Sequence, residues 1–125
     1  LVTKNLRSIL GNVAMPRVDA DASMANEITT RGDVSVTLTS ADYNIQFFNT
    51  TLTANRTITL PSTGVFAGMT YKITRKAGTA GAFTLTVSDP LSGQNYTIPS
   101  NTNGYVEYYA PNTVQWVILN AGIIA

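Results

Sequence analysis

The stretch of this sequence best equipped for chemistry is Gly-Tyr-Val-Glu-Tyr-Tyr, which contains Tyr105, Glu107, Tyr108 and Tyr109. A tyrosine ring offers a flat apolar face together with a polar hydroxyl group. A carboxylate accepts hydrogen bonds, so the combination suits the C–H faces and the hydroxyl groups of a sugar. We therefore predict that these four residues bind glycan or contact another subunit. The alternative is that Glu107 is an ordinary surface glutamate on the solvent side of a strand.

Catalytic groups are scarce in this chain. The sequence has no histidine and no cysteine, which excludes Ser-His and Cys-His nucleophiles and the usual zinc ligand sets. A glycosidase needs two carboxyl groups within roughly 5–10 Å of each other, and the sequence places no second acid beside Glu107. The stretch 19–23 resembles a calcium loop, but Met24 and Thr30 stand where such a loop needs glycine and a bidentate acid. We predict no catalytic residue, no metal ion and no cofactor.

The chain carries little charge. Its formal net charge is +1 and only 12% of its residues are charged, about half of the roughly 25% found in average proteins. The densest basic group is Lys72, Arg75 and Lys76, which we interpret as the solvated face of a strand. Without a basic patch we expect no nucleic-acid partner, and without a long apolar run we expect no membrane insertion. The chain begins at Leu1 rather than methionine, so we expect it to be a piece of a longer product.

Strands must position these side chains, because from Asp33 onward apolar and polar residues alternate along the chain. Threonine is the usual polar partner, since its β-branched side chain suits a pleated sheet. In one stretch this alternation predicts that Tyr43, Ile45 and Phe47 point inward. The stretches with this pattern are 33–39, 43–49, 56–60, 69–76, 82–88, 95–99, 104–110 and 114–120.

Short strands separated by turns rich in Gly, Pro, Asn and Asp predict an all-β fold. We expect a jelly-roll-like β-sandwich of about eight antiparallel strands. No period of roughly 20–50 residues repeats along the chain, which disfavours a solenoid or a propeller. The sandwich domain is expected to span residues 32–125, after a short N-terminal stalk or linker, helical or extended, at residues 1–31. Leu6, Ile9 and Val13 form one apolar stripe in that segment.

The last predicted strand is apolar on both of its faces. Trp116 alternates with Val117 and Leu119, and Ile123 and Ile124 follow near the end of the chain. A strand with one solvated face does not need this pattern, so we predict that these five residues, with Leu6, Ile9 and Val13, form an interface between subunits. The alternative is a central strand whose outer face is covered by residues 1–31.

The order of these motifs resembles a small β-domain that recurs in bacteriophage tail fibres and tailspikes. In that pattern an Asn-Arg-Thr-x-x-Leu-Pro segment precedes a Gly-x-x-Tyr-x-Ile strand and a Thr-rich strand. A tyrosine-rich strand and a strand containing Trp close the domain. The matching segments of this chain are 55–61, 68–73, 84–87, 105–109 and Trp116, and the resemblance covers roughly residues 50–119.

The resemblance implies a homotrimeric, jelly-roll-like module on the virion, exposed to the extracellular medium. Such modules assist trimer assembly or touch the surface of the host cell, so the implied partners are other copies, the rest of the spike or fibre chain, and host polysaccharide. The catalytic carboxylates of tailspikes usually lie in a separate β-helical domain, which implies that this chain is an accessory module and not an enzyme. The alternatives are a carbohydrate-binding module of a polysaccharide-degrading enzyme and a decoration domain of a capsid or head fibre.

Overall fold

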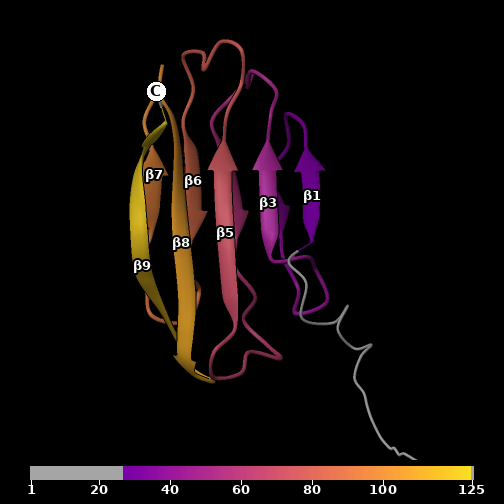
Figure 1. Cartoon of the computed structure of the whole chain (residues 1–125), viewed down its shortest axis with the longest axis vertical. Helices are drawn as coiled ribbons and strands as arrows, with labels where there is room; N and C mark the ends of the chain where they lie inside the picture. The colour runs from indigo at the N-terminus through magenta and orange to yellow at the C-terminus, as the bar shows by residue number, and fades with distance from the viewer. Residues whose placement is uncertain (1–26, 125) are drawn as a thin grey trace, which may run out of the picture.

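The computed structural model describes residues 27–124, and these residues form two β-sheets that face each other (Figure 1). Among them there are nine strands and no helix, which confirms the all-β class. The strands are β1 (Ile28–Arg31), β2 (Val36–Thr37), β3 (Ile45–Phe48), β4 (Arg56–Thr59), β5 (Thr70–Arg75), β6 (Leu85–Ser88), β7 (Tyr96–Ile98), β8 (Asn103–Asn112) and β9 (Gln115–Ile124). Sheet A has the order β1-β3-β5-β8-β9, and sheet B has the order β2-β4-β6-β7.

The first six strands wind as a superhelix, because the chain passes from one sheet to the other after each strand. We call this superhelix of β1 to β6 the coil. In sheet A, β1, β3 and β5 are parallel neighbours, and their arrows point the same way in Figure 1. In sheet B, β2, β4 and β6 are parallel in the same manner. Ile28, Ile45 and Lys72 lie side by side, although the chain between the first two is shorter than between the last two. Turns of unequal length have no fixed period, which is why no repeat is visible in the sequence.

Antiparallel strands appear only at the C-terminal side of this coil. Strand β7 pairs with β6 in sheet B, while β8 pairs with β5 and β9 with β8 in sheet A. The prediction that all strands are antiparallel is therefore wrong, since the pairings among β1 to β6 are parallel. Jelly-roll connectivity joins antiparallel strands, and it is not confirmed here. Strand positions follow from residue alternation, whereas the pairing direction depends on which strands meet in space.

The core lies between the two sheets and takes apolar side chains from both. Strand β3 enters it with the opposite phase from the one predicted, because Phe48 and the amide side chain of Gln46 are fully buried. Ile45 and Phe47 instead lie on the outer face of sheet A, half-buried. Parallel pairing sets this phase, since Ile45 lies beside the exposed Lys72 of β5. The apolar side chains with no exposed surface at all are Phe48, Ile58, Leu60, Ile73, Leu85, Val87, Val106, Tyr108, Ala110 and Trp116.

The prediction that Arg75 lies on a solvated strand face is wrong, because its side chain has no exposed surface. Lys72 and Lys76, its companions in that prediction, are exposed. The Arg75 guanidinium donates to three backbone carbonyls: Nε to Thr102 O at 3.0 Å, Nη1 to Phe83 O at 2.8 Å and Nη2 to Pro99 O at 2.6 Å. Nη2 also donates to Thr102 O. These contacts bind the loops before β6 and before β8 to the end of β5.

Strand β1 falls within the residues 1–31 that the sequence assigns to a stalk, yet it pairs with β3 as part of sheet A. The stripe Leu6, Ile9 and Val13 lies outside the described residues, so its predicted role in an interface stays a prediction. At the other side of sheet A, β9 is an edge strand and not a central one. Among the described strands β9 is therefore not central, and the part of the alternative in which residues 1–26 cover its outer face lies outside the described residues.

Candidate functional site

The outer face of sheet A carries most of the predicted glycan site. Along β8 the side chains alternate, so Tyr105, Glu107 and Tyr109 face outward and are half-buried. The pairing with β5 places them beside Thr74, Lys72 and Thr70 in that order. Strand β8 lies between β5 and β9, so its outward side chains stand in the interior of the sheet and not at its edge.

Glu107 forms an ion pair with Lys72 across β5 and β8, with Nζ 3.2 Å from Oε2. Both side chains remain partly exposed, so the pair contributes at most about 1 kcal/mol to stability and its hydrogen-bonding atoms stay accessible. A shallow hollow of about 120 Å³ lies beside the pair, and Ile45 and Leu119 contribute apolar surface to it. Donor, acceptor and apolar groups thus meet in one place. The alternative, that Glu107 is an ordinary surface glutamate on the solvent side of a strand, also fits its outward position and its partly exposed ion pair.

Tyr105 lies across β9 opposite Gly122. A Cβ atom on Gly122 would come within 3.0 Å of the Tyr105 ring and of its hydroxyl oxygen. The absence of a side chain therefore lets the ring rest against the backbone of β9. Tyr109 lies opposite Val117 in the same sheet. The outer face consequently offers two tyrosines flanking the Lys72–Glu107 pair.

Tyr108 borders the hollow, but its side chain is not part of this face, which corrects the prediction that its ring contacts glycan. Its side chain is fully buried between the sheets, and its hydroxyl donates to Gln94 O at 2.6 Å. Burial, with a smaller contribution from the charge of Asp89, raises the pKa of the Tyr108 hydroxyl above its ordinary value. Strand alternation gives the reason, because adjacent residues of a strand point to opposite faces.

Trp116 is likewise a core residue and not an interface residue. It is fully buried, its indole N–H donates to Pro61 O at 3.0 Å, and its ring meets Tyr71 edge to face at a centroid distance of 5.8 Å. Lone indole N–H groups need an acceptor when they are buried, and the carbonyl after β4 supplies it. Trp116 therefore joins the last strand to the coil.

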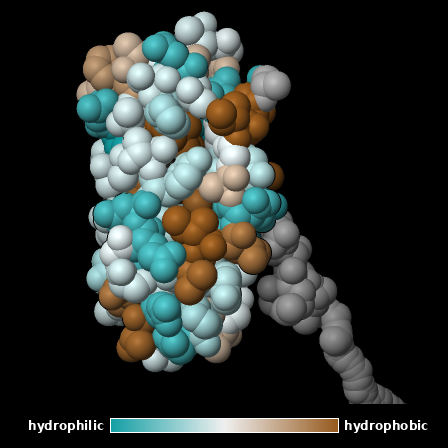
Figure 2. All heavy atoms as spheres, turned by 90° about the vertical axis from the view of Figure 1, so that its left-hand side faces the viewer, coloured by the Kyte–Doolittle hydropathy of each residue, from teal (hydrophilic) through white to brown (hydrophobic). Residues whose placement is uncertain are grey.

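The other residues predicted for an interface lie on β9 at the edge of sheet A. Leu119 is 64% exposed and Ile123 is 76% exposed, while Val117 and Ile124 are half-buried. A register irregularity between Glu107 and Tyr108 leaves Leu119 without an opposite residue on β8. Figure 2 looks onto the side of the molecule formed by β9 and β7, and hydrophobic residues gather in its middle and near its upper end.

A loop at residues 89–94, which we name the edge loop, touches the free edge of β9. Ser92 Oγ accepts the backbone N–H of Trp116 at 3.2 Å and lies 2.9 Å from the Trp116 carbonyl oxygen. Gln94 Oε1 accepts the backbone N–H of Ile118 at 3.3 Å. Asp89, which is 4% exposed, accepts hydrogen bonds from the backbone N–H groups of Leu91, Ser92 and Gln94 and lies 2.6 Å from Ser92 Oγ.

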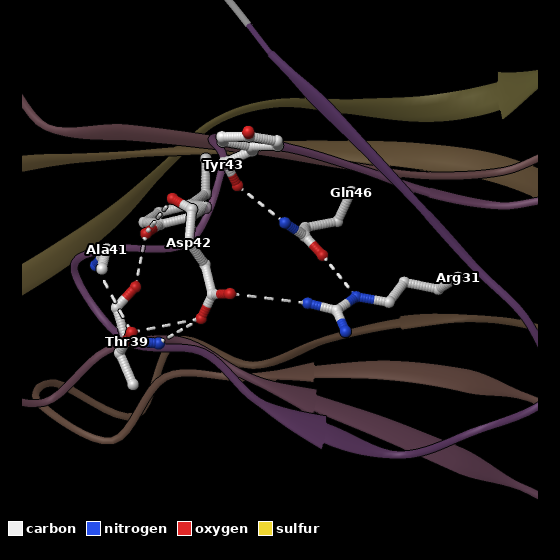
Figure 3. Close-up of polar contacts among 7 residues, drawn as sticks. Arg31, Thr39, Ala41, Asp42, Tyr43 and Gln46 are labelled. Carbon is white, nitrogen blue, oxygen red and sulfur yellow. Dashed lines mark hydrogen bonds and ion pairs between the residues drawn. The ribbon is translucent and has the colours of Figure 1, made fainter.

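A second polar cluster lies where the coil begins (Figure 3). Arg31 Nε donates to Gln46 Oε1 at 2.7 Å, and Gln46 Nε2 donates to Tyr43 O at 2.7 Å. The Arg31 guanidinium also faces Asp42, with 3.7 Å between Nη2 and Oδ1. Asp42 Oδ2 accepts the backbone N–H of Thr39 at 2.7 Å. These contacts pair the groups with one another and close the first turn of the coil, so we assign the cluster a structural role.

Sequence reasoning missed Lys72 as a neighbour of Glu107, and it also missed the edge loop. Lys72 lies far from Glu107 in the sequence, and only the pairing of β5 with β8 brings them together. The edge loop had a local signal, because Asp89 precedes Ser92 by three residues in a turn, where Asp commonly accepts backbone hydrogen bonds. Its contact with β9 depends on the fold and has no local signal.

Residues 27–124 contain no group of three or more acidic side chains able to hold a metal ion. No helix within this part of the chain is long and apolar enough to cross a membrane. Comparisons of the chain with models of protein families, with curated proteins and with solved structures find no match.

Proposed function

We propose that this chain is a structural module of a bacteriophage tail fibre or tailspike that assembles into homotrimers. Its partners are two further copies and the rest of the fibre chain, and its place is on the virion, in the extracellular medium. The sequence resemblance motivates the proposal, and one observation supports it. Strand β9 is a long apolar edge of a kind that a monomer in water normally avoids.

A comparison of the four sheet edges carries this argument. The edge strands β2 and β7 of sheet B have two and three residues, and short edge strands give a second chain little to pair with. Strand β1 has four residues, and its Arg31 points inward to Asp42 and Gln46. Strand β9 has ten residues, and none of them is charged. Leu119 and Ile123 thus form exposed apolar surface at the one long edge among the described strands.

Sedimentation equilibrium tests the proposal directly. We expect the wild-type chain to sediment at three times its mass of 13.4 kDa, and we expect Leu119→Asp and Ile123→Asp to shift the equilibrium to monomer. Ile28→Asp is the matched control, since Ile28 is also an exposed isoleucine, at 58%, but lies on β1 at the opposite edge of the sheet. A monomeric wild-type chain at micromolar concentration would refute the trimer.

A second candidate function is binding of host-surface polysaccharide, either for adhesion by the fibre or as a carbohydrate-binding module of a degrading enzyme. The specific observation in its favour is the outer face of sheet A. There the Tyr105 ring is seated over Gly122, and Glu107 and Lys72 supply an acceptor and a donor. Weak contacts of this kind gain avidity when several copies act together.

Calorimetry with host polysaccharide tests this second function. We expect Tyr105→Ala and Glu107→Gln each to weaken binding at least fivefold, because one removes a stacking surface and the other an ionic acceptor. Thr57→Ala, on the exposed face of β4 in the other sheet, is the control. Unchanged affinity in the Tyr105→Ala variant would count against this face.

We propose no catalytic role for the chain. Its described carboxylates have structural partners. Asp33 binds Arg56 at 2.8 Å, Asp42 faces Arg31 and Glu107 pairs with Lys72. Asp89 accepts backbone N–H groups of its own loop, and Glu27 lies beside the Tyr43 hydroxyl. Location on a capsid or head fibre instead of the tail involves the same assembly, and labelling of intact virions with an antibody against the domain distinguishes the two.

A further inference from the structure

The N-terminal half of β9, which contains Trp116 and Ile118, already has hydrogen-bonding partners along its outer edge. In an antiparallel sheet, the outward N–H and C=O groups of an edge strand would meet those of the next strand. Here Ser92 Oγ takes the N–H of Trp116, and Gln94 Oε1 takes the N–H of Ile118. Two side chains of the edge loop therefore stand where a further strand would pair.

The edge loop is held firmly enough to serve in this way. The Asp89 carboxylate lies almost completely buried beneath it and accepts backbone N–H groups at 2.9–3.0 Å from Leu91, Ser92 and Gln94. The Ser92 hydroxyl has one hydrogen, which either Asp89 Oδ2 or the Trp116 carbonyl can accept, while its lone pairs accept the Trp116 N–H. The Ser92 hydroxyl thus connects Asp89 in the loop to the backbone of Trp116 at the strand edge.

Protection by charge is missing from this edge. Many proteins prevent their edge strands from pairing with other chains by placing lysine or other charged residues on them. Gln115–Ile124 contains no charged residue, so two copies of β9 do not repel each other electrostatically. Within residues 27–124, no loop hydrogen bond comparable to those of Ser92 and Gln94 reaches 119–124.

We propose that the edge loop is a guard that prevents a second copy of this chain from adding a strand along Trp116 and Ile118. The occupant of that part of the edge is the chain's own loop. Backbone pairing between copies is therefore confined to 119–124, six of the ten residues of the strand. Without the guard the whole length of β9 can pair with β9 of a second copy, so that two copies join through one continuous sheet. This inference goes beyond the proposed function and does not depend on the number of subunits.

The test compares Ser92→Ala/Gln94→Ala with the wild-type chain by hydrogen exchange and sedimentation velocity. We expect exchange at the Trp116 and Ile118 amides of dilute protein to rise about fivefold, since each loses its acceptor. At higher concentration we expect species larger than the wild-type oligomer. Two controls should behave like the wild-type chain. The first is Ser100→Ala, which lies in another loop. The second is the double variant Ser92→Thr/Gln94→Glu, which keeps an oxygen acceptor at both positions.

A single variant keeps the test decisive if the double variant unfolds. Gln94→Ala leaves the Asp89 contacts in place, because Asp89 binds the backbone of residue 94 and not its side chain. We expect this variant to keep its tryptophan fluorescence and to form larger species more slowly than the double variant. Folded Gln94→Ala protein with wild-type exchange at Ile118 and wild-type sedimentation would overturn the proposal. If the wild-type chain is a monomer and the variants that lack the guard still associate, the trimer proposal is refuted and the proposal for the edge loop is supported.

Discussion

Replacement of Arg75 by methionine should be among the most damaging substitutions in the chain. The variant keeps a long unbranched side chain but removes the donors for the carbonyls of Phe83, Pro99 and Thr102. The three carbonyls belong to residues that are themselves exposed or half-buried, so water can replace part of what the guanidinium provides. A hydrogen bond to a charged group contributes about 1.5–3 kcal/mol net of hydration, and the lower end of this range gives roughly 4–5 kcal/mol for three bonds. Removal of the buried charge returns part of this energy, so we expect a net loss of about 2–3 kcal/mol, out of the roughly 5–15 kcal/mol typical of a domain.

Urea unfolding followed by fluorescence measures this loss, because Trp116 is the single tryptophan of the chain and is fully buried. Arg75→Lys should cost at least as much, since a strongly hydrated ammonium stays buried and cannot span three carbonyls. Lys76→Met is the control: Lys76 is the exposed next residue, and surface changes usually stay within about 0.5 kcal/mol. A loss below about 1 kcal/mol for Arg75→Met would refute the view that the guanidinium ties the loops together.

Four further outcomes are expected. Gly104→Ala should lower the free energy of unfolding by about 1–3 kcal/mol, because its Cβ atom would lie 2.8 Å from the Gly122 carbonyl oxygen. Gly122→Ala should lower it less, because the half-buried Tyr105 ring can move, and thermal unfolding of both variants checks this order. Trp116→Phe should lose about 1–3 kcal/mol by leaving Pro61 O without its donor, and circular dichroism during urea unfolding measures it, with Tyr109→Phe on the outer face as the control. Burial, and secondarily the charge of Asp42, raises the pKa of Tyr71 to about 12 from 10.0, so the unfolded chain ionises first and this hydroxyl alone should lower stability by about 1.4 kcal/mol per pH unit between these values, in addition to the effect of Tyr108, whose pKa is also raised. Tyr71→Phe should reduce the slope by that amount, and an equal slope in both proteins would contradict the assignment. Burial raises the pKa of Asp89, but hydrogen bonds from Ser92, Gln94 and Leu91 outweigh burial and leave the pKa below 3.8. The ionised carboxylate therefore stabilises the fold above pH 3.8, and this stabilisation is lost as the pH falls through the lower pKa of the folded state. An acid-unfolding midpoint unchanged in Asp89→Asn would argue against this role.

Strand positions could be predicted from the sequence because they depend on neighbouring residues. Alternation around Ile58, Ile73 and Val106 is visible in any short window, and each of these side chains is buried as a strand pattern requires. Pairing direction has no such local source. Nothing near Ile45 in the sequence indicates that Lys72 will lie beside it, so the parallel coil was missed.

The candidate site divides in the same way. Tyr105, Glu107 and Tyr109 share a face because they are two residues apart, whereas Tyr108 was included only because aromatic residues stood together in the sequence. Arg75 was misjudged because charge usually indicates exposure. Its partners are carbonyls of distant loops, which no residue type announces. Composition therefore predicted the kind of surface, and strand geometry decided which residues occupy it.

The hydrogen bond between Trp116 and Pro61 has a consequence for biosynthesis. A ribosome makes β1 to β6 first, but the core between them is filled only when Trp116 and the hairpin of β8 and β9 arrive. Domains generally fold as whole units during translation, and pairings between distant parts of a chain form slowly. We therefore expect nascent chains that end before residue 116 to stay open to proteases, while the synthesis of β9 allows the whole domain to fold.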